Sequence, residues 1–226
     1  MLLANTDFEQ TLKLPAQTIS YLRPSGSGRE PQAPLAASVM ESLKDAGIMA
    51  PEGGLTVAGQ RLVGIVSDPV QQLVVRQVHA LEENAIHVFF GRAECVVWAR
   101  IINAQGVASG ECILSRTTAE NALQHVLAWV DMPVVAVPDD ALVSADAEDL
   151  AASVFSIDSR GWRVSSSALP GDVNIFYRHG ALWRLKGVAE AEGARNRLVL
   201  QAEDSLSLNM LIHYVWGLCV QGLGAV

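Results

Sequence analysis

The chain of 226 residues repeats one order of features in its two halves, and this repetition constrains its fold most strongly. An aromatic strand, a Trp-containing strand and a terminal helix recur 85 to 88 positions apart. The matched features are residues 86–90 (IHVFF) and 173–177 (VNIFY), Trp98 and Trp183, and His125 and His213. Each half is therefore expected to run strand, strand, strand, helix, which favours an internal duplication. Chance similarity among apolar segments is the alternative.

Local patterns in the first half predict two helices followed by a group of strands. Apolar residues recur every four positions over 35–43, and Gly47 stands where a left-handed cap commonly ends a helix. Thr56 is a suitable N-cap for a second short helix through Val66, and the Asp68-Pro69 step disfavours its continuation. Runs rich in Val, Ile and aromatic residues predict antiparallel strands at 73–80, 86–90, 95–102 and 111–115, followed by a helix from Thr117 or Thr118 to Pro133.

Residues 133–150 separate the two halves and carry five carboxylates. These belong to Asp139, Asp140, Asp146, Glu148 and Asp149. The D-x-D-x-D-G spacing of a calcium loop is absent, so we predict a solvated acidic connector, with room for one short helix over 147–155. The chain thus divides into an N-terminal half (1–132), the connector and a C-terminal half (151–226), which we expect to form one compact domain.

Charge and cysteine usage exclude several classes of protein. The 16 Lys and Arg against 24 Asp and Glu give a net charge of −8, and no cluster of basic residues occurs. Nucleic acid is therefore not an expected partner. Cys95, Cys112 and Cys219 are odd in number and lack C-x-x-C spacing. This indicates reduced thiols in a cytoplasmic protein rather than a disulfide framework or a zinc site.

No targeting or membrane-spanning segment is expected. Asp7 and Glu9 stand where a signal peptide would carry Lys or Arg before an apolar run. The most apolar stretch, residues 206–220, is shorter than the roughly 20 residues that a bilayer requires. It also contains Asn209 and His213. We interpret it as a helix that is buried or covered by a partner.

The usual signatures of catalysis and metal binding are missing from the sequence. No His lies in an H-E-x-x-H motif, and no Ser lies in a G-x-S-x-G nucleophile elbow. The two G-x-G triplets, 26–28 and 222–224, do not lie between a strand and a helix, as a phosphate cradle would require. We therefore expect no catalytic, cofactor-binding or metal-binding residues, and a binding protein rather than an enzyme.

The last helix gives the positive signal for binding. Over residues 206–219 apolar side chains surround it on nearly every side. Such a helix is either wholly in the core or half core and half interface. Its Met, Tyr and Trp are residue types enriched at interface hot spots.

Several short motifs occur in the order typical of one known family. A helix is followed by AGIMAPEGG (46–54), VSDP (66–69), a strand over 73–78 and the hairpin FGRAEC (90–95). This order resembles the EspG family, the cytosolic chaperones of type VII (ESX) secretion in mycobacteria and relatives. The resemblance covers residues 34–218 and rests on the pattern as a whole.

The resemblance implies an α+β fold, with helices flanking a central twisted, largely antiparallel sheet in two pseudo-symmetric halves. It implies a cofactor-free protein that binds the apolar tip of a PE–PPE heterodimer and keeps this tip from aggregating. The implied partner-binding residues are Gly91, Arg92, Ala93 and Glu94, then Asn103, Gln105 and Gly106, and on the last helix Met210, Tyr214 and Trp216. Arg92 and Glu94 would form the rim, and Met210 and Trp216 the anchors. A tight hairpin explains the glycines equally well.

Two other functions, and a second kind of partner, remain open at this point. The helices over 35–47 and 56–66 with the following hairpin could form a winged-helix-like regulatory module, although the second helix offers only Gln60 and Arg61 for recognition. A hydrolase site could be assembled from the scattered residues His87, Ser165 and Asp172. A homodimer is the second kind of partner.

Overall fold

The described part of the chain folds around a single ten-stranded sheet. The computed structural model describes residues 10–22, 37–79, 82–102, 108–130, 135, 142–146, 160–178, 180–189 and 197–223. Its strands are β1 (Gln10–Pro15), β2 (Gln71–His79), β3 (Glu82–Phe90), β4 (Cys95–Ile102), β5 (Ala108–Thr117), β6 (Leu142–Asp146), β7 (Arg160–Ser166), β8 (Val173–Arg178), β9 (Ala181–Ala189) and β10 (Arg197–Glu203). Its helices are α1 (Thr18–Leu22), α2 (Ala37–Asp45), α3 (Val57–Ser67), α4 (Ala119–Val130) and α6 (Ser205–Leu223).

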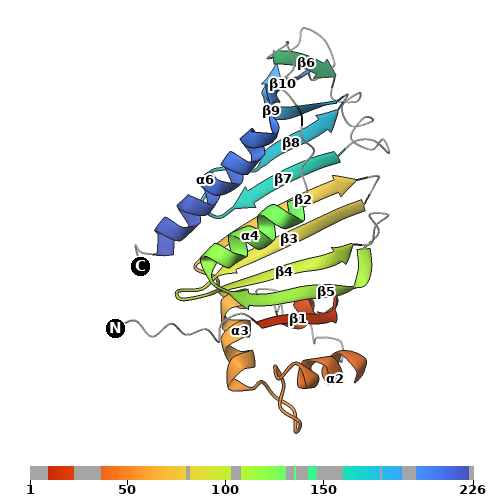
Figure 1. Ribbon diagram of the computed structural model, residues 1–226, viewed down its shortest axis with the longest axis vertical. Helices are drawn as coiled ribbons and strands as arrows, with labels where there is room; N and C mark the ends of the chain where they lie inside the picture. Colours follow the sequence, from red (N-terminus) through yellow and green to blue (C-terminus); the bar gives the residue numbers. More distant parts are fainter. Residues whose placement is uncertain are drawn as a thin grey trace.

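The strands lie in the order β1-β5-β4-β3-β2-β7-β8-β9-β10-β6, and every neighbouring pair is antiparallel (Figure 1). The expected α+β class with a largely antiparallel sheet is therefore confirmed. Strands β2–β5 form one meander, which α4 follows, and strands β7–β10 form another, which α6 follows. The two meanders join through β2 and β7, where Val75 pairs with Val164.

The matched sequence features lie at equivalent places in the two meanders. Residues 86–90 belong to β3 and residues 173–177 to β8, the second strand of each meander. Trp98 lies in β4 and Trp183 in β9, the third strand of each. The four strands predicted between residues 73 and 115 are confirmed as β2–β5, whereas the simpler repeat of three strands before each helix is wrong, because each meander has four.

Strands β1, β6, β7 and β10 were not expected as such. Strand β1 lies in the mixed N-terminal segment and pairs with β5, where Leu14 packs into the core. Strand β6 lies within residues 133–150 and pairs with β10, so this stretch is not simply a connector. The helix expected over 147–155 lies outside the described residues.

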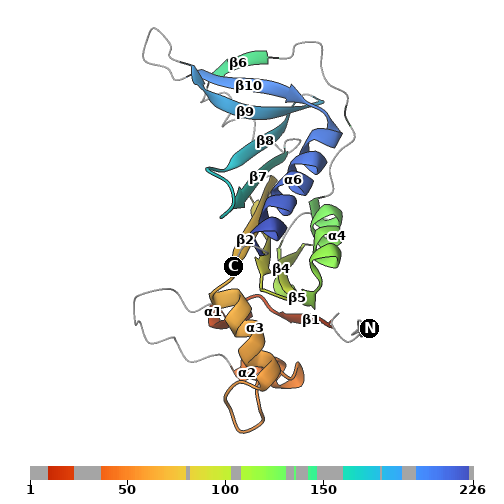
Figure 2. The same cartoon turned by 90° about the vertical axis from the view of Figure 1, so that its left-hand side faces the viewer.

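The helices cover the two faces of the sheet (Figure 2). Helices α4 and α6 pack on one face, where Leu73, Val88 and Phe90 belong to a core shared by both meanders. Helices α1, α2 and α3 pack on the opposite face near β1, over a second core that includes Phe89 and Trp98. Successive residues of a strand point to opposite faces, which is why Phe89 and Phe90 enter different cores.

The caps predicted for α2 and α3 are confirmed. Gly47 follows α2 with a φ of 69°, the left-handed conformation that glycine adopts most easily. The Thr56 side chain accepts a hydrogen bond of 3.0 Å from the Gly59 backbone N–H at the start of α3. Helix α3 ends at Ser67, just before Asp68-Pro69.

Two glycines of α3 are expected to respond oppositely to alanine. A Cβ at Gly59 would lie 2.1 Å from the Ile48 carbonyl oxygen, whereas a Cβ at Gly64 would have no atom within 4 Å. Gly59→Ala should lower the free energy of unfolding by about 1–3 kcal/mol, as overpacking does. Gly64→Ala should raise it by about 0.5–1 kcal/mol, because alanine favours a helix. Urea unfolding followed by circular dichroism measures both, and equal effects would contradict this packing.

Candidate protein-binding surface

Helix α6 has one buried face and one exposed, mainly apolar face, on which the polar side chains of His213 and Gln221 are also exposed. The buried face consists of Leu208, Ile212, Val215, Trp216 and Cys219. On the other face Leu206, Met210 and Tyr214 are 60%, 61% and 63% exposed, and Val220 is exposed as well. We call these four side chains the α6 stripe. Of the two interpretations left open by the sequence, α6 is therefore half core and half surface.

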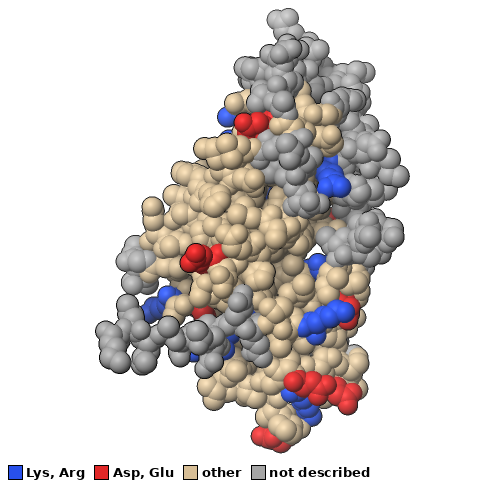
Figure 3. Space-filling view, viewed as in Figure 1, with Lys and Arg blue, Asp and Glu red and all other residues tan. Residues whose placement is uncertain are grey.

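The α6 stripe is uncharged as well as apolar. The segment from Ser205 to Leu223 contains no Asp, Glu, Lys or Arg. Figure 3, which views this side of the molecule, shows an uninterrupted surface without charged residues over α6. Solvent-exposed helix faces normally carry charged residues, and a neutral apolar face is typical of a contact surface.

Asp204 fixes the start of this helix. Its carboxylate accepts hydrogen bonds from the Ser207 backbone N–H at 2.7 Å and from the Ser207 hydroxyl at 2.8 Å. These hydrogen bonds lower the pKa of Asp204 from its ordinary value, so the capping carboxylate is ionised at neutral pH.

Trp216 does not belong to the exposed surface, which corrects its prediction as an anchor for a partner. It is 7% exposed, and its ring lies 4.8 Å from that of Phe90 in a tilted arrangement. Positions 212, 216 and 219 follow each other at helical spacing, so Trp216 shares the face that packs on the sheet. Met210 and Tyr214, in contrast, are exposed as the prediction requires.

The predicted contact residues 91–94 form the turn between β3 and β4. Gly91 donates its N–H to the Glu94 carbonyl oxygen at 2.9 Å. A Cβ at Gly91 would lie 2.9 Å from Ile65 Cγ1, so this position needs glycine to pack against α3. Arg92 and Ala93 are exposed. The tight-hairpin interpretation thus explains Gly91, and Arg92 and Ala93 are left available for contact.

Glu94 was predicted as a rim residue, and this prediction is wrong. Its side chain is 3% exposed, and its Oε1 lies 2.5 Å from the Arg61 Nε of α3. Its Oε2 accepts a hydrogen bond from the Arg116 Nε of β5. A carboxylate is buried only when its charge is paired, and these two arginines supply the pairing. Glu94 therefore fixes the turn to α3 and β5.

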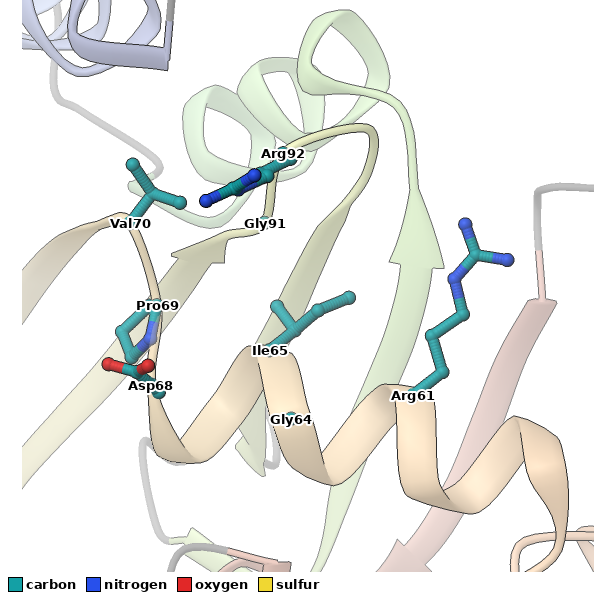
Figure 4. Close-up of a pocket in the computed structure, with 8 residues that line it drawn as sticks. All are labelled: Arg61, Gly64, Ile65, Asp68, Pro69, Val70, Gly91 and Arg92. Atoms are coloured by element: carbon teal, nitrogen blue, oxygen red, sulfur yellow. The ribbon is translucent and has the colours of Figure 1, made fainter. Parts of the chain in front are cut away.

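A hollow of about 390 Å³ lies beside this turn (Figure 4). It is lined by Arg61, Gly64, Ile65, Asp68, Pro69, Val70, Gly91 and Arg92. Ile65, Pro69 and Val70 make part of its wall apolar, and the Arg92 side chain extends toward Val70. Among the described residues Arg92 has no ion-pair partner, so its guanidinium can meet an acidic group of another molecule.

The remaining predicted contact residues, Asn103, Gln105 and Gly106, lie outside the described residues. The structure therefore describes two of the three predicted contact regions, the 91–94 turn and α6.

The structure does not arrange the residues of the two alternative functions, the hydrolase site and the winged-helix-like module, as either function would require. Val74 of β2 pairs with His87 on one side and Ser165 on the other, so a whole strand separates them. Across two strand spacings their Cα atoms lie about 10 Å apart, too far for a direct Ser–His hydrogen bond. In place of a wing, β2 and β3 are interior strands of the sheet, and Arg61 of α3 is paired with Glu94.

Within the described residues no group of three or more His, Cys, Asp or Glu is placed to hold a metal ion. Residues Leu206–Leu223 of α6 are long and apolar enough to cross a membrane by length and composition, a criterion that core helices of water-soluble proteins also meet. Here the helix packs on the sheet through its buried face.

No protein-family model matches the chain, and no curated protein matches it either.

Loss of the Glu94 carboxylate should destabilise the protein. Glu94→Gln removes the carboxylate charge that faces the half-buried Arg116 and the more exposed Arg61, so the free energy of unfolding should fall by about 1–3 kcal/mol. Glu111→Gln is the matched control, because the Lys13–Glu111 pair of 2.7 Å is exposed and should contribute less than about 1 kcal/mol. Equal losses in urea unfolding would contradict the buried role of Glu94.

The three thiols should be unreactive in the folded protein. Burial raises the pKa of Cys95 to about 12, with further increases from Cys219 and Glu94, and burial also raises the pKa values of Cys112 and Cys219. Only the thiolate reacts, and the raised pKa keeps each cysteine in its thiol form at mildly alkaline pH. A thiol reagent should therefore label none of the three until denaturant is added. Rapid labelling of any thiol in the native protein would contradict their burial.

Proposed function

We propose that this chain is a cytosolic chaperone of the EspG kind, which binds a PE–PPE-type helical heterodimer and keeps it soluble for type VII (ESX) secretion. The single observation that carries the proposal is the α6 stripe, an apolar and uncharged face on a well-packed helix. An apolar helical tip exposed to water aggregates, and an apolar platform covers it by burying the same kind of surface.

The order of the strands supports the family assignment within this proposal. Both meanders have four strands and a following helix, and an additional strand, β1 or β6, pairs with the last strand of each. We propose that the two meanders are pseudo-symmetric halves of EspG type. Their pseudo-two-fold axis would then pass between β2 and β7, since an antiparallel pair is compatible with a two-fold axis normal to the sheet.

The surroundings of the α6 stripe supply the polar rim that a protein interface needs. Trp216 of α6 packs against Phe90, and the 91–94 turn follows Phe90 directly. Arg92 therefore belongs to the end of the sheet that the C-terminal half of α6 covers. Arginine is enriched among interface residues and forms paired hydrogen bonds with a carboxylate. In the proposed complex Met210 and Tyr214 are the anchors, and Arg92 contacts an acidic residue at the rim.

The proposal is tested by mixing the purified protein with purified PE–PPE heterodimers from the same organism. Co-elution in size-exclusion chromatography is expected for a cognate pair, and calorimetry gives its affinity. Met210→Glu combined with Tyr214→Glu should weaken binding at least about tenfold, because the interface would bury unpaired charges.

The matched control is Val57→Glu on α3. Val57 is 83% exposed and lies in the first turn of its helix, where a carboxylate is tolerated. This variant should bind like the unmodified chain. Failure of every heterodimer to bind, or equal binding by the control and the α6 variant, would overturn the proposal.

A further inference from the structure

The exposed side of α6 has a projecting side chain, Met210, and an open position at Gly217, which we call the notch, as well as the α6 stripe. Leu206, Met210 and Tyr214 are four residues apart and lie in one row along the helix. Gly217 falls on the same side by helical spacing, and a Cβ there would meet no atom within 4 Å. This side therefore carries long projecting side chains followed by an open gap in the row.

From this arrangement we infer that two copies of the chain associate through their α6 helices, antiparallel about a two-fold axis. An axis between His213 and Tyr214 brings Met210 of each copy opposite Gly217 of the other, and Leu206 opposite Gln221. The projecting Met210 of each copy then fills the notch at Gly217 of the other, so the same contact forms twice. Such a self-complementary contact is what a two-fold dimer requires.

Charge favours this surface as the place where two copies meet. Each copy carries a net charge of −8, so contact between charged surfaces brings like charges together. From Ser205 to Leu223 the helix contains no Asp, Glu, Lys or Arg. Pairing through α6 therefore buries apolar surface without bringing carboxylates of the two copies into contact.

The size of the contact indicates a weak and reversible dimer. A helix of 19 residues is about 29 Å long and about 10 Å wide, so one face offers about 300 Å². Stable interfaces bury about 800 Å² on each partner. Such a dimer covers the α6 stripe when nothing else does. One further step rests on the proposed function: binding of a PE–PPE-type heterodimer to the α6 stripe displaces the second copy.

Sedimentation velocity over a wide concentration series tests the dimer without any partner protein. The unmodified chain should shift from monomer to dimer as its concentration rises. Met210→Glu and Gly217→Leu should each weaken the association at least about tenfold, by burying a charge and by filling the notch. Val57→Glu should dimerise normally. Circular dichroism and a thermal melt confirm that each variant is folded.

Disulfide cross-linking tests the register. Tyr214→Cys lies at the proposed axis, so under mild oxidation it should link two copies readily. Leu206→Cys lies about 11 Å along the helix from the axis, so the two copies of this residue would be about 22 Å apart and should not link. The native cysteines are buried and do not compete.

Several results would overturn the inference. These are a monomer at every concentration, a dimer that persists in Met210→Glu, equal cross-linking of Leu206→Cys and Tyr214→Cys, or binding of the monomer to anionic lipid vesicles through the same residues. Each leaves heterodimer binding to be measured separately. Heterodimer binding without self-association removes only this inference, and self-association without heterodimer binding removes only the proposed function.

Discussion

The pairing of β2 with β7 is the interaction on which the rest of the structure depends. It joins Leu73–His79 to Arg160–Ser166 and turns two meanders into one sheet. Without it each meander would expose the edge of a long strand, with unpaired N–H and C=O groups. With it, Val75 and Val164 lie side by side in the core beneath α4 and α6. Both helices therefore pack on a surface to which both meanders contribute.

The position of α6 follows from this shared core and gives rise to its exposed face. Leu208, Ile212 and Val215 fit the sheet, and they occupy one side of the helix only. The same helix carries Leu206, Met210 and Tyr214 on the other side, where folding alone would favour charged residues. Sequences break such a local rule mainly at functional sites. The departure lies on a rigid element, so the surface is presented in one fixed geometry.

Local signals predicted part of the fold and long-range contacts decided the rest. Thr56, Gly47 and the runs of Val, Ile and aromatic residues in β3 and β4 act within a few residues, and their predictions are confirmed. Strands β1 and β10 are short and mix polar with apolar residues, so only pairing with β5 and β9 identifies them. Glu94 looked like a surface residue because Arg61 and Arg116 are distant in sequence. Trp216 looked like an anchor because the sequence does not show which side of α6 meets the sheet.

These two corrected residues explain how the candidate contact regions are held together. Trp216 fixes the C-terminal half of α6 to Phe90, at the end of β3. Four residues further along the chain, Glu94 ties the turn to α3 and β5 through its two arginines. Arg92 lies between these fixed points and is itself exposed. The turn and the exposed side of α6 are therefore coupled through buried contacts. A second molecule that contacts both the turn and the exposed side of α6 meets a preorganised surface, which lowers the entropic cost of binding.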